Sequence, residues 1–192
     1  MPILKALGRE RPLGLLHIDA HCDTSGPFEG SRFHHGGPFR EAVLAGVLDP
    51  ERTIQIGIRG MAGYLWEFSG DSGMTVIEIG EFQRMGVDAT IAKIRAVLGT
   101  GPVYISFDID SIDPGFAPGT GTPEVGGLTS YEMLQLIRGL RGLNLIGFDL
   151  VEMSPPFDHS NITAILAANL AFEFLSLACS PAEISGQRGV VM

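Results

Sequence analysis

The sequence predicts an α/β fold with a mainly parallel sheet. Short runs rich in aliphatic and β-branched residues, typical of buried strands, alternate with longer stretches whose apolar residues recur at helical spacing. Two of these runs, 13–18 and 102–107, end in clusters of acidic side chains. Strands that alternate with helices form parallel sheets, and ligands bind such sheets beyond the carboxyl ends of the strands. We therefore expect a single domain over residues 1–192 with its site at that edge.

The individual elements follow from local signals. We expect strands at 13–18, 53–58, 74–79, 102–107 and 143–150, and helices at 1–11, 39–48, 88–98, 129–140 and 161–177. Arg11-Pro12 ends the first helix, and Thr129 or Ser130 is suited to cap the fourth because Glu132 lies in its first turn. Gly- and Pro-rich stretches at 24–38, 115–127 and 152–159 are expected to be loops.

Composition excludes several classes of protein. With 192 residues, 45% of them hydrophobic, the chain can build a substantial core. Its formal charge of −9 argues against binding to nucleic acid or to an anionic membrane surface. Cys22 and Cys179 form no CxxC motif, and no signal peptide is evident, so we expect a cytoplasmic protein. Since no run of about 18 apolar residues is evident, we expect no membrane span.

The acidic clusters predict a metal site. Asp108 and Asp110 alternate at the end of one strand, and Asp19, His21 and Asp23 alternate at the end of another, so each set shares a face. Carboxylates held so close repel one another unless a cation lies between them. One cluster alone could equally cap backbone N–H groups, but two together favour metal. Four carboxylates and one imidazole suit Mn²⁺ or a similar hard ion, which predicts metal-assisted hydrolysis.

These residues also carry a resemblance. The stretches 19–23, 106–123 and 147–152 resemble three separated signatures of the ureohydrolase (arginase/agmatinase) family. The resemblance implies a three-layer α/β/α fold with two Mn²⁺ ions. It also implies hydrolysis of a guanidino group to urea and an amine by a hydroxide that bridges the ions.

The resemblance further implies roles for individual residues. The metal ligands would be Asp19, His21, Asp23, Asp108 and Asp110, with Asp19 and Asp108 bridging. His35 matches the proton-shuttle histidine of the family, and the neighbouring His34 is the alternative. Glu152 matches the carboxylate that binds the guanidinium in the family, and the alternative is an ion pair between Glu152 and a nearby Arg.

Thr24 and the segment 157–159 resemble agmatinases more than arginases. The expected substrate is therefore a small, cationic, linear guanidino compound such as agmatine. The alternatives are a guanidinobutyrase or guanidinopropionase activity, or an inactive metal-binding fragment.

One expected motif is missing. In the family a Gly-Gly-Asp-His-Ser segment precedes the first acidic strand, and its His is the sixth metal ligand. The chain contains no such segment, so we expect it to match roughly the last two-thirds of the usual fold. One of the two Mn²⁺ sites would then be incomplete. Many relatives form homo-oligomers, which the resemblance suggests here as well.

Overall fold

A five-stranded parallel sheet forms the centre of the protein. The computed structural model describes residues 1–60 and 66–179. The strands follow the order β3-β2-β1-β4-β5, and all neighbouring pairs are parallel. They are β1 (Leu13–Ile18), β2 (Leu48–Ile58), β3 (Thr75–Glu78), β4 (Val103–Asp108) and β5 (Leu145–Val151). The predicted α/β class is confirmed.

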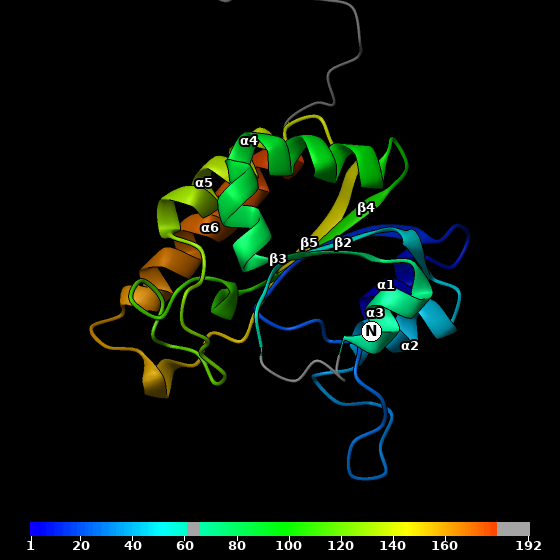
Figure 1. The fold of residues 1–192 in the computed structure, drawn as a ribbon, viewed down its shortest axis with the longest axis horizontal. Helices are drawn as coiled ribbons and strands as arrows, with labels where there is room; N and C mark the ends of the chain where they lie inside the picture. Colours follow the sequence, from blue (N-terminus) through cyan, green and yellow to red (C-terminus); the bar gives the residue numbers. More distant parts are fainter. Residues whose placement is uncertain (61–65, 180–192) are drawn as a thin grey trace, which may run out of the picture.

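Helices cover both faces of the sheet, which gives the three-layer α/β/α arrangement (Figure 1). One layer holds α4 (Ile79–Leu98), α5 (Ser130–Gly139) and α6 (Ile162–Cys179), and the opposite layer holds α1 (Pro2–Leu7), α2 (Pro38–Leu44) and α3 (Glu67–Ser72). Two short 3₁₀ turns, η2 (Ile109–Ser111) and η3 (Pro155–Phe157), follow β4 and β5.

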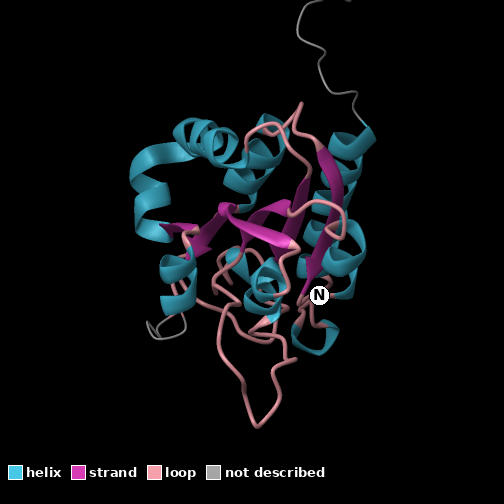
Figure 2. Cartoon of the chain, turned by 90° about the vertical axis from the view of Figure 1, so that its right-hand side faces the viewer, coloured by secondary structure: helices cyan, strands magenta, loops and turns pink. Residues whose placement is uncertain are grey.

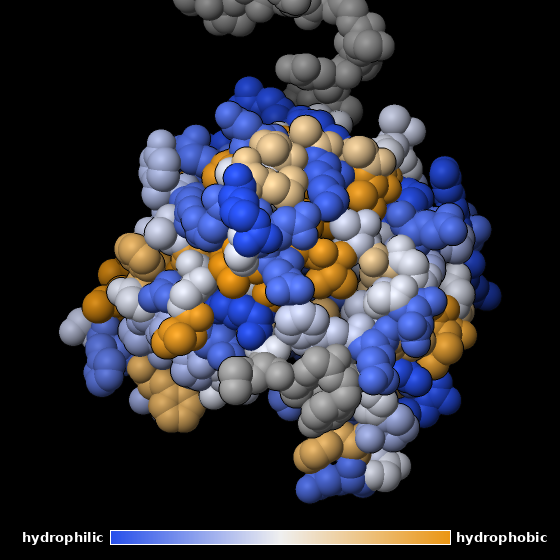
Figure 3. Space-filling model, in the orientation of Figure 1, coloured by the Kyte–Doolittle hydropathy of each residue, from blue (hydrophilic) through white to orange (hydrophobic). Residues whose placement is uncertain are grey.

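Each face of the sheet has its own apolar core. The larger core joins the sheet to α4, α5 and α6, and the smaller one joins it to α1 and α2 through residues such as Leu4, Leu15 and Phe39. The central strands β1 and β4 are buried along their whole length, because helices lie on both faces. The longest loops project from one side of the sheet (Figure 2). Hydrophilic residues separate the hydrophobic ones on the face seen in Figure 3.

Several element boundaries differ from the predictions. The helix predicted for 39–48 ends at Leu44, and β2 begins at Leu48 rather than at residue 53. The helix predicted from residue 88 already begins at Ile79, because two helical segments join across a kink at Gly86, whose φ is 77°. Helix α3 was not predicted. It contains Ser and Gly and is only six residues long, so local propensity favours it weakly.

Helix α6 requires a correction. Within the described residues it is long and apolar enough to cross a membrane by length and composition, so the prediction that no such stretch exists is wrong. However, α6 packs against α5 and β5 and buries one side, formed by Thr163, Ala167, Leu170 and Phe174. Helices that cover a sheet pass the same test of length and composition, so the test does not place α6 in a membrane.

Candidate metal centre and cavity

The acidic residues of β1 and β4 meet at one edge of the sheet. The parallel register pairs Ile18 with Phe107, so Asp19, just after β1, lies beside Asp108, the last residue of β4. Asp110 follows in the turn η2. The exposed fractions of Asp19, Asp108 and Asp110 are only 1%, 4% and 1%. Two neighbouring strands thus bring three largely buried carboxylates together.

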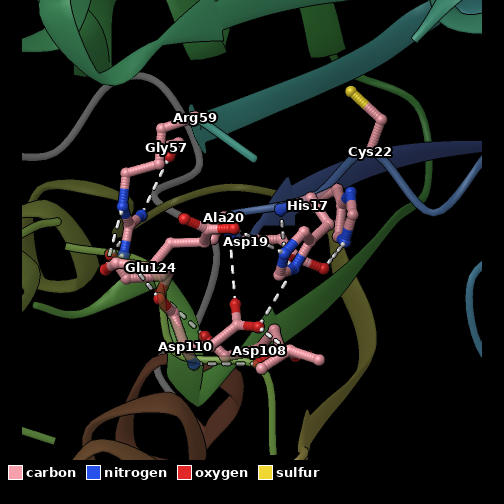
Figure 4. Close-up of polar contacts among 12 residues, drawn as sticks. His17, Asp19, Ala20, Cys22, Gly57, Arg59, Asp108, Asp110 and Glu124 are labelled. Carbon is pink, nitrogen blue, oxygen red and sulfur yellow. Dashed lines mark hydrogen bonds and ion pairs between the residues drawn. The ribbon is translucent and has the colours of Figure 1, made fainter. Parts of the chain in front are cut away.

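Backbone and side-chain donors fix the directions of these carboxylates (Figure 4). The amide of His21 donates to Asp19 Oδ1 at 2.6 Å, and the amide of Asp110 donates to Asp108 Oδ1 at 2.8 Å. Asp110 itself accepts from the amide of Ala20 at 3.1 Å, which links the two strand ends directly. Because these donors are parts of the fold, the carboxylates are preorganised.

The cluster carries more negative charge than its surroundings balance. Burial, and then the charges of Asp19 and Asp110, raise the pKa of Asp108 to about 10. Burial and the charge of Asp19 likewise raise the pKa of Asp23 to about 7. Burial also opposes ionisation of Asp19, but its contacts with His17 and His21 outweigh this and lower its pKa. A site that holds protons on carboxyl groups at neutral pH is one that a cation can occupy instead.

The donor set fits a divalent ion. Ligand atoms of Asp19, His21 and Asp110 all lie within 4.8 Å of one another, and so do those of His17, Asp19 and Asp23. Asp19 belongs to both groups. His21 turns Nδ1 toward Asp110 Oδ2 at 3.1 Å, and hydrogen bonding to Asp110 and then to Asp19 raises the pKa of its imidazole to about 11. Oxygen-rich sets of this kind suit Mn²⁺ and related hard ions.

A cavity of about 750 Å³ opens above the cluster. Six of the seven predicted site residues line it: His21, Asp23, His35, Asp108, Asp110 and Glu152. The seventh, Asp19, is buried beside His21. Asp23 and Glu152 adopt positive φ values of 53° and 63°, which residues other than Gly rarely do. Such strained positions persist where the surrounding structure demands them, often at functional sites.

The loop between β1 and α2 closes one side of the cavity. His35 and His34 both line it, but only His34 is fixed by a hydrogen bond, between Nε2 and the carbonyl of Gly26 at 2.8 Å. His35 is exposed and makes no hydrogen bond within residues 1–60 and 66–179. His34 therefore holds the loop, whereas the imidazole of His35 remains available to a ligand.

Four further residues of the site were not predicted. Arg59 donates to the carbonyls of Asp110 at 2.8 Å and of Glu124 at 2.6 Å, and so ties the end of β2 to the loop that closes the cavity. The Glu124 carboxylate lines the cavity near His21. His17 and Gln55 are buried beneath the carboxylates. The alternation of Asp19 and His21 extends back to His17, and this was the signal in the sequence.

Cys22 takes no part in the acidic cluster. Its side chain points away from Asp19 (Figure 4). Burial raises the pKa of its thiol to about 12, so the thiolate form of Cys22 is strongly disfavoured.

Comparison with known proteins identifies relatives over most of the chain. The model of the arginase family matches residues 1–176. A guanidinopropionase from Pseudomonas aeruginosa is 53% identical over 185 residues, which cover 95% of this chain and 58% of that protein. A mitochondrial agmatinase from Gallus gallus is 48% identical over 177 residues, covering 91% of this chain and 52% of the relative.

A solved structure agrees with these matches. Proclavaminate amidino hydrolase from Streptomyces clavuligerus superposes with a TM-score of 0.86 at 43% sequence identity, over 91% of this chain and 59% of the other. The chain therefore spans between half and three-fifths of the length of these relatives.

Proposed function

Because the chain belongs to the arginase family, we propose that it hydrolyses a linear guanidino compound to urea and an amine at a divalent-metal site, with Mn²⁺ as the ion. The observation that carries the proposal is the convergence of the seven predicted residues. They come from the ends of β1, β4 and β5 and from the loop at 24–38, yet six of them line one cavity and the seventh, Asp19, is buried beside it. Metal-assisted hydrolysis of a cationic substrate needs ligands for the metal and a pocket for the cation, and the carboxylates of this cavity could serve as both.

The proposed metal ligands are the five residues with buried or half-buried donors: Asp19, His21, Asp23, Asp108 and Asp110. When bound, divalent ions polarise the reacting group and lower the pKa of water, which makes hydrolysis possible near neutral pH. The residues of the chain hold these ions through carboxylates that hydrogen bonds already orient. Two ions are proposed, of which one has the poorer ligand set.

Two residues that line the cavity are proposed to act on the substrate, one by binding it and one by transferring a proton. Glu152 lines the cavity after the end of β5, where its carboxylate can accept two N–H groups of a guanidinium. His35 lies on the loop at 24–38, which also lines the cavity, and is proposed to carry a proton to the leaving amine. Both side chains are exposed to the cavity, so neither must be desolvated before the substrate arrives.

The lining of the cavity favours a cationic substrate. Among the described residues that line it, the ionisable side chains are mainly carboxylates, including those of Glu124 and Glu152, and histidines. No Lys or Arg is among these lining residues. Agmatine, with a guanidinium at one end and an ammonium at the other, suits this lining. The 53% identity with a guanidinopropionase supports a second candidate, a guanidino acid, whose carboxylate would have to pair with His34 or His35.

Urea release by the 192-residue chain tests the proposal. The chain is loaded with Mn²⁺ and offered agmatine, 3-guanidinopropionate, 4-guanidinobutyrate and arginine at equal concentration. Urea from agmatine alone supports the first candidate, and urea from a guanidino acid supports the second. If Mn²⁺ binds but no substrate yields urea, the chain is an inactive metal-binding fragment, and the proposed activity is wrong for it.

A further inference from the structure

A row of polar residues crosses the sheet directly beneath the carboxylates. The strand register pairs Gln55 of β2 with His17 of β1, His17 with Ser106 of β4, and Ser106 with Asp149 of β5. Gln55 and His17 are 0% and 1% exposed. Buried polar side chains are costly unless they are hydrogen-bonded, so their presence between apolar neighbours calls for an explanation.

His17 connects this row to the metal centre. Its Nε2 lies 2.8 Å from Asp19 Oδ2, and its Nδ1 lies 3.0 Å from the Gln55 side-chain nitrogen. The imidazole packs against the ring of Phe39, with 4.4 Å between the centroids. The ring is therefore held on its edges by two polar partners and on one side by an aromatic residue, which leaves it little freedom to turn.

The orientation of Gln55 decides which nitrogen of His17 carries the proton. The Gln55 nitrogen also lies 2.6 Å from the carbonyl oxygen of Cys22, and a carbonyl oxygen can only accept. The amide NH₂ must therefore face Cys22, and it donates its second hydrogen to Nδ1 of His17. A neutral imidazole whose Nδ1 accepts carries its hydrogen on Nε2, which then donates to Asp19.

The same arrangement leaves one atom unsatisfied. The side-chain oxygen of Gln55 is buried and has no hydrogen-bond partner within the described residues. Such an atom typically costs about 1–3 kcal/mol. Turning the amide over would not remove this cost, because its oxygen would then face the oxygen of Cys22. The fold thus tolerates an unsatisfied oxygen while it keeps the donor directed at His17.

We propose that His17, held by Gln55, is a positioning residue that orients the Asp19 carboxylate for metal binding. This inference rests on the proposed function, since it assumes that Asp19 is a ligand. Asp19 accepts a hydrogen bond from His17 on Oδ2 and one from the amide of His21 on Oδ1. Both oxygens are therefore fixed in direction, and each retains a lone pair for an ion. Outer partners of this kind typically change metal affinity by 10- to 100-fold.

A direct role for His17 as a ligand is the rival interpretation, because its ring nitrogen lies within 4.8 Å of ligand atoms of Asp19 and Asp23. Two substitutions separate the interpretations. In His17→Gln the amide nitrogen takes the place of Nε2 and can still donate to Asp19, whereas His17→Leu removes the donor and keeps an apolar side chain of similar size.

The test is calorimetric titration of the 192-residue chain with Mn²⁺. We expect His17→Leu to bind the same number of ions with a Kd raised about 10- to 100-fold, and His17→Gln to stay within about threefold of the unchanged chain. The loss of one ion in both variants would make His17 a ligand and overturn the proposal. An unchanged Mn²⁺ affinity in both variants would mean that His17 only packs in the core, and it would overturn the proposal as well.

A second measurement needs neither metal nor substrate, so it stands even if the proposed activity fails or His17→Leu does not fold. In the metal-free chain, ¹⁵N NMR of the imidazole should show a hydrogen on Nε2 of His17, the nitrogen that faces Asp19. In Gln55→Leu the donor to Nδ1 is gone, and we expect the Nδ1–H form to become detectable. A neutral ring with its hydrogen on Nδ1, which leaves no hydrogen on Nε2 for Asp19, would overturn the proposal.

Discussion

Replacing Asp108 by Asn tests whether the buried carboxylates hold a metal. Asp108 is 4% exposed, and burial together with Asp19 and Asp110 raises its pKa to about 10, so it carries a proton at pH 7 in the metal-free chain. Asn has the same shape, is also neutral, and can still accept the hydrogen bond from the amide of Asp110. We therefore expect the free energy of unfolding of the metal-free protein to change by no more than about 1 kcal/mol.

Metal affinity, in contrast, should fall steeply in Asp108→Asn. A carboxylate and a divalent ion about 4 Å apart attract each other by about 8 kcal/mol at an effective dielectric constant of 20. Before the ion binds, Asp108 must lose its proton, which costs about 4 kcal/mol at pH 7 because its pKa is about 10. The remaining 4 kcal/mol or so corresponds to a change on the order of 10³ in Kd.

Thermal unfolding with and without Mn²⁺ measures this difference. At a concentration 100 times its Kd, the ion stabilises the unchanged chain by about 2.7 kcal/mol, which raises the Tm by roughly 5–11 °C. The variant should gain less than about 1 °C and release no urea. Asp88→Asn, an exposed change on α4, should keep the full shift. An undiminished Mn²⁺ shift or retained urea release in Asp108→Asn would refute the metal assignment.

Four further outcomes are expected. Glu152→Gln should lower kcat/KM about 10- to 100-fold in a urea assay, because it removes the charge from the hydrogen bonds to the guanidinium. His35→Ala should lower kcat by about 10²- to 10⁴-fold while calorimetry shows little change in Mn²⁺ affinity. Mn²⁺ affinity should rise with pH between 6 and 8, by up to about tenfold per unit for each proton displaced, because the pKa of Asp23 is raised to about 7 and the ion must displace its proton at lower pH. Thr129→Ala should lower the Tm by about 2–4 °C without changing urea release at room temperature, because it breaks the capping box of α5.

Neighbouring residues supply the controls. His34→Ala should affect kcat less than His35→Ala does, since His34 is occupied with the carbonyl of Gly26. Ser130→Ala should leave the Tm nearly unchanged, because the side chain of Thr129 makes the cap. A Glu152→Gln variant that loses Mn²⁺ affinity rather than catalytic efficiency would contradict the substrate role of Glu152. A fall in Mn²⁺ affinity with rising pH would contradict proton displacement from Asp23.

The parts of the fold with strong local signals were predictable. Strands β1 and β4 are apolar runs with acidic ends, and the cap of α5 is a Thr with a Glu three residues later; both signals were interpreted correctly. Helix α3 carries no such signal, and its Ser69 is completely buried, so tertiary packing rather than local propensity accounts for it. The first part of α4 was not predicted, because Gly86, whose φ is 77°, interrupts the helical pattern.

Some residues of the candidate site were likewise predictable from local signals, and others were not. Asp19 and Asp108 were found because alternation puts their side chains on one face of a strand, and this depends only on local geometry. Arg59 was missed because its partners are main-chain carbonyls 51 and 65 positions away in the sequence, at Asp110 and Glu124. Its role depends on how the loops meet, and no local pattern encodes that.

The polar row beneath the carboxylates links folding to the site. His17 and Asp19 share a face of β1, and the register that pairs Ile18 with Phe107 also places Asp19 beside Asp108. A slip of one residue between these strands would turn the acidic side chains to opposite faces and leave His17 beside an apolar partner. The apolar core on each face already selects the correct register, because the strands are buried throughout. The packing that stabilises the sheet is therefore also what brings the carboxylates together, and their mutual repulsion is a cost that the core must outweigh until a cation binds.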